Sequence, residues 1–395
     1  MIKTYDTVAP DAPAVAAAPR SDAELAALAL KHGTPLYVYD LPRLRARVAE
    51  LRSALAGAEA RLFFATMAND CPQVLRLLAN AGVGACVNSI PHLSLASDVG
   101  FPPQRIQFTS TGIARADMRL LQTSGIRTNI DSLSQLEEWF GLGALEAGIR
   151  VNAASLGRGR SADRIGIEAA DVNKAAAIAN HFGCSLTGLH IYLGTNFQHH
   201  YEMLPTLESF FDLAASVSGL RYLNIGGGIG INYRHEGPGF DVFAFGQGVE
   251  EYTRLLRARL KQHVDVIVEP GRGLTAECGT FITSVTDVKE LGERRFAAVD
   301  GSVAVFPRPF HHPDTPHRIR QIVAGVEPLH NDDQYADTTI VGRTTFSKDI
   351  LGAASLPQGL RIGDLLAFDD AGSYSQSMAS RFLGQPDPQV AFLNG

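Results

Sequence analysis

The segment Phe63-Phe64-Ala65-Thr66-Met67-Ala68-Asn69 is an apolar run that ends in a short polar turn. Continuous apolar runs of this length are typical of strands in a parallel sheet that is covered by helices on both faces. Similar runs recur from about residue 60 to residue 270, separated by Ala- and Leu-rich segments and by Gly or Pro. We expect eight strands here: Leu62–Thr66, Val83–Val87, Arg105–Thr109, Thr128–Asp131, Ile149–Ala153, Leu186–Leu193, Tyr222–Ile225 and Val264–Val268.

Eight apolar strands that alternate with helices predict an α/β fold of the closed (β/α)8 type, a TIM-like barrel. An open, doubly wound sheet is the competing architecture. We expect the barrel to occupy residues 45–275 and a helix over Leu41–Leu55 to lead into it.

A second domain is expected after Gly273, where short runs are separated by Gly, Pro and Asp turns with little helical spacing. This pattern of short runs and turns predicts a β-sandwich or β-barrel domain over residues 276–395. Residues 31–44 are assigned to the same domain, because Pro35–Tyr39 reads as a strand that can pair into it. Residues 1–30, Ala- and Pro-rich in part, are expected to be a flexible tail. Within residues 276–395, the runs expected to form strands are Phe281–Val285, Phe296–Val299, Thr338–Val341 and Leu365–Phe368.

The composition favours small-molecule ligands. The chain has 395 residues and a net charge of -6, so it lacks the positive field that nucleic acids or anionic membranes attract. Its apolar runs are shorter than the roughly 20 residues that span a bilayer. The four cysteines are far apart, which is typical of reduced thiols in the cytoplasm. No metal site is expected, because the doublets His199-His200 and His311-His312 lack a further ligand at suitable spacing.

The candidate site lies at the carboxyl ends of the last three barrel strands, where such barrels carry their chemistry. Gly226-Gly227-Gly228 follows the seventh run, and we expect its backbone N–H groups to approach an anion and to cap a helix start. Glu269-Pro270-Gly271-Arg272 follows the eighth run, and His190 lies in the sixth. His190 either stacks over an aromatic cofactor or is a core histidine. Together these parts suit a phosphorylated heteroaromatic cofactor.

The chain resembles the fold-type III pyridoxal-phosphate decarboxylases, a family that includes diaminopimelate, ornithine and siderophore-pathway amino-acid decarboxylases. The resemblance runs from about Thr34 to Phe392. It rests on ordered motifs: Thr34 to Asp40, Phe63 to Asn69, Arg150-Val151-Asn152, Arg164 to Ile167, His190 to Thr195, Gly226 to Gly228, Glu269 to Arg272, Arg308-Pro309, Gly342 to Asp349, Gly363-Asp364, Gly372 to Tyr374 and Phe382 to Gly384.

The resemblance implies a role for each matching residue. Glu269 would pair with the pyridine nitrogen of pyridoxal 5'-phosphate, and His190 would cover one ring face. Other cofactor contacts are implied for Gly194, Thr195, Gly226, Gly227, Gly228, Gly271, Arg272 and Tyr374. Arg308, Phe346 and Asp349 would meet the substrate. The family works as a head-to-tail homodimer, so the loop from Gly342 to Asp349 would reach into the partner's site.

Several motif positions depart from the family. Met67 occupies the position of the Schiff-base lysine, and Thr345 that of the catalytic cysteine. Phe346 replaces an acidic residue, and the segment from Cys86 to His92 lacks two carboxylates of the family motif. Natural divergence and an engineered inactive variant are both open. Met67 is interpreted either as a gap-filler in the core or as part of the site. One hypothesis is that Lys348 supplies an amine to the neighbouring subunit.

Two functions follow from this resemblance. The first is a pyridoxal-phosphate-binding decarboxylase that acts on an amino-acid-like substrate other than meso-diaminopimelate and holds its cofactor without a covalent bond, or a relative with altered chemistry on a phosphorylated ligand. The second is a non-catalytic paralogue that serves as a regulatory or scaffolding partner.

Overall fold

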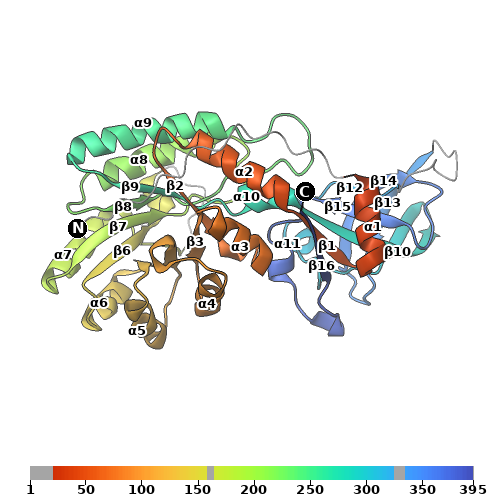
Figure 1. Cartoon of the computed structure of the whole chain (residues 1–395), viewed down its shortest axis with the longest axis horizontal. Coiled ribbons are helices and arrows are strands. Elements are labelled where there is room, and N and C mark those ends of the chain that lie inside the picture. The colour runs from red at the N-terminus through yellow and green to blue at the C-terminus, as the bar shows by residue number, and fades with distance from the viewer. Residues whose placement is uncertain (1–20, 158–163, 324–333, 395) are drawn as a thin grey trace.

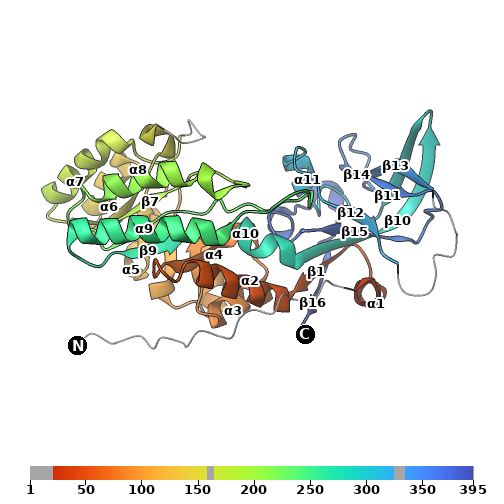
Figure 2. The same cartoon turned by 90° about the horizontal axis from the view of Figure 1, so that it is seen from above.

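The molecule consists of two lobes that lie end to end (Figures 1 and 2). The computed structural model describes residues 21–157, 164–323 and 334–394. The first lobe is a closed barrel of parallel strands in the order β2-β3-β4-β5-β6-β7-β8-β9. The predicted (β/α)8 barrel is therefore confirmed, and the open doubly wound sheet is excluded because β2 pairs with β9.

All eight predicted runs form barrel strands, and helices surround them (Figure 1). The strands are β2 (Arg61–Ala65), β3 (Gly84–Val87), β4 (Ile106–Thr109), β5 (Arg127–Ile130), β6 (Glu146–Val151), β7 (Ser185–Ile191), β8 (Tyr222–Asn224) and β9 (Asp265–Val268). The helices are α2 (Leu41–Ala54), α3 (Pro72–Asn80), α4 (Ile90–Asp98), α5 (Arg115–Thr123), α6 (Leu133–Gly141), α7 (Val172–His181), α8 (Leu204–Ala214) and α9 (Val242–Leu260).

Large and small side chains alternate inside the barrel. Phe63 of β2 and Tyr222 of β8 are buried and fill the interior. A Cβ atom at Gly84 would lie 2.7 Å from the Phe63 ring, and one at Gly188 would lie 1.9 Å from the Tyr222 ring. The glycines thus provide the space that the two aromatic rings occupy, and the barrel is a packed core rather than a channel.

The second lobe is an eight-stranded sheet in which β12-β15-β10-β11-β13-β14 are neighbours and β1 joins β10 and β16. Its strands are β1 (Leu36–Asp40), β10 (Gly279–Leu291), β11 (Arg294–Val299), β12 (Ile319–Gln321), β13 (Tyr335–Val341), β14 (Ile350–Pro357), β15 (Leu365–Asp369) and β16 (Gln389–Leu393). The short helices α10 (Arg272–Thr275) and α11 (Arg308–His311) flank it. The predicted N-terminal strand pairs with β10 in antiparallel orientation, so its assignment to this lobe is confirmed.

The expected tail over residues 1–30 needs a correction. Residues 1–20 lie outside the described part of the chain, but residues 22–30 belong to helix α1 (Asp22–His32). Ser21 and Glu24 form a reciprocal capping box at its start, and Leu25 is fully buried against the β lobe. The capping box and one buried face explain why this segment is helical.

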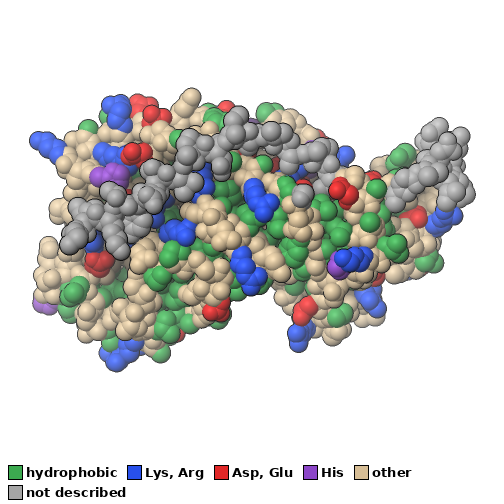
Figure 3. Space-filling view, viewed as in Figure 1, with side chains coloured by type: hydrophobic (Ala, Val, Ile, Leu, Met, Phe, Trp, Pro, Cys, Tyr) green, Lys and Arg blue, Asp and Glu red, His purple; other side chains and the backbone are tan. Residues whose placement is uncertain are grey.

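Charged side chains of both signs are mixed on the face of the molecule shown in Figure 3. On the face shown in Figure 3, the Lys and Arg side chains of the described residues are scattered singly or in small groups among acidic ones. Within the described residues, no helix is both long and apolar enough to cross a membrane.

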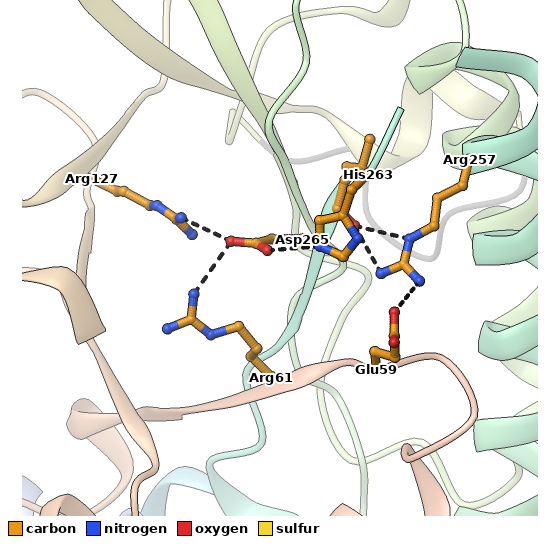
Figure 4. Close-up of polar contacts among 7 residues, drawn as sticks. Glu59, Arg61, Arg127, Arg257, His263 and Asp265 are labelled. Carbon is orange, nitrogen blue, oxygen red and sulfur yellow. Dashed lines mark hydrogen bonds and ion pairs between the residues drawn. The ribbon is translucent and has the colours of Figure 1, made fainter. Parts of the chain in front are cut away.

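Asp265 is the centre of an ion-pair cluster at the amino-terminal end of the barrel (Figure 4). Its carboxylate lies between two guanidinium groups, 3.3 Å from Nη1 of Arg61 and 2.9 Å from Nη2 of Arg127. His263 approaches the other carboxylate oxygen at 3.2 Å. Residues at this end of a barrel contribute to stability rather than to chemistry.

We expect Asp265→Asn to lower the free energy of unfolding by about 1–3 kcal/mol, between the values for exposed and for buried ion pairs. The two arginines would keep their positive charges close together without a counter-charge. Urea unfolding followed by circular dichroism measures the change. Asp212→Asn, which breaks an exposed pair with Arg259, is the control and should change stability by less than about 0.5 kcal/mol. Equal effects of the two substitutions would contradict the prediction.

Candidate active site

A buried carboxylate and a buried imidazole meet at the carboxyl-terminal mouth of the barrel. Glu269 follows β9 directly, and His190 lies in β7. Nε2 of His190 is 3.3 Å from Oε2 of Glu269, and the side-chain amide of Asn224 donates to Oε1. Both side chains are more than nine-tenths buried. Two of the predicted site residues, Glu269 and His190, therefore lie within hydrogen-bond distance of each other.

The protonation states of this pair follow from its surroundings. Burial lowers the pKa of His190, so the imidazole is neutral. Burial raises the pKa of Glu269, but His190, Cys86 and Asn224 outweigh it and hold the pKa below its usual range. Because a carboxylate can only accept, Nε2 of His190 carries the proton. Nδ1 is then a buried acceptor, and it has no partner among the described residues. The site therefore offers a fixed anion beside a neutral ring.

The glycine-rich turns bring three backbone segments into close contact beside this pair. A Cβ atom at Gly226 would lie 2.3 Å from the carbonyl oxygen of Ile191, and one at Gly227 would lie 2.3 Å from that of Glu269. Gly226 and Gly228 also have positive φ values, of 70° and 99°. Only glycine fits these close approaches. The expected helix start is wrong, however, because the chain after Gly228 continues as a loop until α9 begins at Val242.

The turn after β9 adds a buried guanidinium and a buried phenol. A Cβ atom at Gly271 would lie 3.0 Å from Cβ of Ala68 and 3.3 Å from the hydroxyl of Tyr374. Cζ of Arg272 lies 4.9 Å from the centre of the Tyr374 ring, and its Nη1 donates to the hydroxyl of Tyr233 at 2.7 Å. Nε of Arg272 is buried and has no partner among the described residues. A buried cation with an unused donor is suited to an anionic ligand.

Other predicted cofactor contacts lie on the loop after β7. Gly194 has a φ of 137°, and a Cβ atom there would lie 3.1 Å from the ring of Phe197. Thr195 is exposed on the same loop. Phe197 forms a bridge with Ile229, directly after the glycine triplet. This loop therefore lies against the glycine-rich turn, as expected for parts of one site.

Met67 lies at the edge of the site and not in the core. It belongs to a short 3-10 helix, Thr66–Ala68, that follows β2, and 37% of its surface is exposed. Its carbonyl oxygen accepts from Ser377 at 3.0 Å, and the carbonyl of Ala68 accepts from the backbone N–H of Tyr374 at 2.7 Å. The interpretation of Met67 as a gap-filler in the core is therefore wrong, because the thioether is partly open to solvent.

Two predicted substrate residues are engaged in internal contacts. Arg308 is fully buried, and its guanidinium donates to the backbone and hydroxyl oxygens of Thr315, each at 2.9 Å. Asp349 is also buried, and it accepts from the backbone N–H of Val303 at 2.8 Å and from the hydroxyl of Thr344 at 2.5 Å. Both side chains therefore make hydrogen bonds within the β lobe, although Nε of Arg308 is buried and has no hydrogen-bond partner among the described residues.

The remaining predicted residues lie on the loop of the β lobe between β13 and β14. Thr345 and Lys348 are exposed. Phe346 is half-buried, and its ring centre lies 6.0 Å from that of Phe310 and 5.7 Å from that of Phe382. The described contacts of this loop remain within the β lobe.

Some residues of the site had not been assigned a role from the sequence. Arg150 of β6 lies with its Cζ 5.5 Å from the centre of the Tyr192 ring, and it interacts electrostatically with Glu269. Asn224 bridges Glu269 and Gln107 inside the barrel. Arg150 and Asn224 could have been predicted as site residues, because each is a polar residue at the end of an apolar strand. Tyr233 could not have been predicted in this way, because it lies in a loop.

The described residues contain no group of three or more His, Cys, Asp or Glu side chains that could hold a metal ion.

Comparisons with known proteins agree with this arrangement. The family model described as pyridoxal-dependent decarboxylase, pyridoxal binding domain, matches residues 41–276. Diaminopimelate decarboxylase of Methanothermobacter thermautotrophicus is 28% identical, over 93% of this chain and 88% of that protein. A probable chloroplastic diaminopimelate decarboxylase of Oryza sativa subsp. japonica is 31% identical, over 88% of this chain and 73% of that protein.

Solved structures show the same fold. The crystal structure of diaminopimelate decarboxylase from Helicobacter pylori, in complex with L-lysine, matches with a TM-score of 0.84 at 24% identity and covers 94% of both chains. The lysine/ornithine decarboxylase of Vibrio vulnificus, in complex with putrescine, matches with a TM-score of 0.82 at 20% identity, over 94% of this chain and 98% of that one.

Proposed function

This chain belongs to the pyridoxal-dependent decarboxylase family, and from that premise we propose that it decarboxylates an amino-acid-like substrate other than meso-diaminopimelate. The observation that carries the proposal is the buried, ionised Glu269 beside the neutral His190 at the barrel mouth. A buried carboxylate is costly unless hydrogen-bond donors or a cation meet it, and His190 and Asn224 are the donors that keep Glu269 ionised at the barrel mouth.

The residues present fit pyridoxal phosphate. When bound, the cofactor supplies an electron sink for negative charge at the substrate α-carbon. Glu269 would accept a hydrogen bond from the ring nitrogen, and His190 lies beside it with a free Nδ1. The backbone of Gly226 to Gly228 and Gly271 would face the phosphate, together with Arg272, whose Nε is unused. Tyr374, Gly194 and Thr195 complete this set.

Met67 decides how the cofactor is held. A thioether forms no covalent bond with an aldehyde, so we propose that the cofactor is retained through its phosphate and its ring nitrogen. An amine from a second copy of the chain is the alternative source of a covalent bond. Lys348 is exposed on a loop of the β lobe, which makes it accessible to such a copy. We therefore also propose a head-to-tail homodimer in which this loop completes the neighbouring site.

Phe346 supports a substrate whose distal end is not an ammonium group. The ring of Phe346 lies between those of Phe310 and Phe382, so the loop presents an aromatic surface. Asp349, the acidic side chain of the same loop, already accepts hydrogen bonds from the backbone of Val303 and the hydroxyl of Thr344. A distal ammonium group would find no ionic partner in this loop.

We propose a cytoplasmic location, because the cysteines of the chain are unpaired.

A second candidate function is a non-catalytic paralogue that acts as a regulatory or scaffolding partner. Met67 and the exposed Thr345 favour it, because they stand at the positions that supply the lysine and the cysteine in the family. The close approaches of the glycine turns and the buried Arg272 favour retained ligand binding instead.

The test combines cofactor binding with product detection. Purified protein is titrated with pyridoxal phosphate in equilibrium dialysis, and the loaded protein is then incubated with a panel of carboxyl-labelled amino acids. We expect saturable binding and slow release of labelled CO2 from members with an uncharged distal end. Binding without release from any member would favour the non-catalytic paralogue. Absence of binding would overturn the proposed function.

A further inference from the structure

Thr66 links His92 to β3 beside Met67. The hydroxyl oxygen of Thr66 is 3.0 Å from Nδ1 of His92 and 3.1 Å from the backbone carbonyl oxygen of Cys86. Thr66 is almost fully buried, so water does not compete for these contacts. The two distances are both within normal hydrogen-bond range.

These contacts fix the tautomer of His92. The carbonyl oxygen of Cys86 can only accept, so the single proton of the Thr66 hydroxyl points to it. The hydroxyl oxygen must then accept from His92, and Nδ1 carries the ring proton of the neutral imidazole. Nε2 is left with a free lone pair. The hydrogen bond to Thr66 is the one side-chain hydrogen bond that His92 makes among the described residues, and the residue is partly exposed.

His92 lies at the same mouth as the site. It is in the first turn of α4, directly after β3, and its backbone N–H donates to the hydroxyl of Ser89 at 3.3 Å. Thr66 precedes Met67 in the chain, and burial together with the neighbouring Glu269 raises the pKa of the Cys86 thiol. His92 is therefore hydrogen-bonded to the residue that precedes Met67 in the chain, and it is only partly buried.

We propose that His92 is the base of this lysine-free site, an inference that rests on the proposed function. An amino acid arrives with a protonated α-ammonium group, which is not a nucleophile. Nε2 of His92 accepts one proton from it: an N–H bond of the substrate breaks, an N–H bond forms on the imidazole, and the amine lone pair is freed to attack the cofactor aldehyde. The ring becomes a cation that still donates from Nδ1 to Thr66. Because His92 is partly exposed, Nε2 returns the proton to water.

The first test needs no cofactor. Nitrogen-15 NMR of the cofactor-free protein, with the His92 signals assigned by their loss in His92→Asn, should show the proton on Nδ1 and a bare Nε2. Thr66→Val keeps the shape of the side chain but removes the hydroxyl, and it should return His92 to the commoner tautomer with the proton on Nε2. A proton on Nε2 of the neutral ring in the wild type would overturn the inference.

The second test separates the base from a structural role. In His92→Asn the amide nitrogen replaces Nδ1 as donor to Thr66, but Nε2 is gone. We expect the reaction of L-alanine with the bound cofactor, followed by stopped-flow absorbance, to slow by about 100-fold. Dialysis should show unchanged cofactor affinity, and His181→Asn, on the exposed end of α7, should match the wild type.

Each outcome is decisive. An unchanged rate in His92→Asn, or no reaction of L-alanine with the loaded wild type, would refute the role of His92 while the proposed function stands on cofactor binding and CO2 release. Failure of the wild type to bind pyridoxal phosphate would refute the proposed function, whereas the NMR result would still report on the tautomer of His92.

Discussion

The Met67→Lys variant is expected to bind pyridoxal phosphate covalently and to decarboxylate its substrate about 1,000-fold faster than the wild type, within the usual range for a positioned acid–base group. Lysine and methionine have unbranched side chains of similar length. Because Met67 is 37% exposed and lies outside the core, the ammonium group would not be forced into an apolar interior. Ala68, next to it, approaches Gly271 and Tyr374, so the new amine would arise beside the turn that follows Glu269.

Borohydride reduction followed by peptide mass spectrometry locates the covalent bond, and CO2 release measures the rate. Leu120→Lys is a suitable control, since Leu120 is 43% exposed on α5 and adds a lysine outside the barrel mouth. Leu120→Lys should gain neither the covalent bond to pyridoxal phosphate nor the faster release of CO2. A reduced adduct at Lys348 in the wild type would establish an amine donated by the second subunit. If Met67→Lys gains neither the adduct nor activity, the site has been changed by more than the loss of one amine.

The barrel could be predicted from the sequence because each strand is buried on both faces, which produces continuous apolar runs. The boundaries were less accurate where this signal fades. The run expected at Ile149–Ala153 is β6, which spans Glu146–Val151, because an exposed glutamate begins the strand and carries no apolar signal. The run expected at Leu186–Leu193 ends at Ile191, where the chain turns toward Gly194.

The site was predictable where residue type and strand end coincide. Glu269 and His190 belong to this class, because a polar residue at the end of an apolar strand must face the mouth of the barrel. The roles of Arg308 and Asp349 were not predictable in the same way. A sequence shows that a charge is present, but not that the side chain donates to Thr315 or accepts from Val303 within its own lobe.

Contacts between distant segments could not be predicted from the sequence at all. The hydrogen bond from His92 to Thr66 joins residues 26 positions apart, and it depends on how α4 packs beside the end of β2. Tyr233, which accepts from Arg272, lies in a long loop between β8 and α9. Neither pair has a motif, because each is specified by tertiary packing and not by local spacing.

Gly227→Ala is expected to weaken pyridoxal phosphate binding at least about 10-fold and to lower the free energy of unfolding by about 1–3 kcal/mol, as overpacking does elsewhere. The new methyl group would lie 2.3 Å from the carbonyl oxygen of Glu269, and a backbone atom cannot swing away as a flexible side chain can. Relief requires separating the glycine turn from the end of β9. That movement would strain the 2.8 Å hydrogen bond from the N–H of Glu269 to the carbonyl of Gly226.

The same loop offers a matched control. Gly239 also lies between β8 and α9, has no positive φ, and has no atom within 4 Å of the position that a new methyl group would take. Gly239→Ala should therefore leave both affinity and stability unchanged. Equilibrium dialysis and urea unfolding of the two variants separate the steric effect from the general effect of adding a methyl group to this loop. Equal behaviour of the two would mean that the glycine turn is not held against Glu269, and the proposed phosphate site would lose its geometric basis.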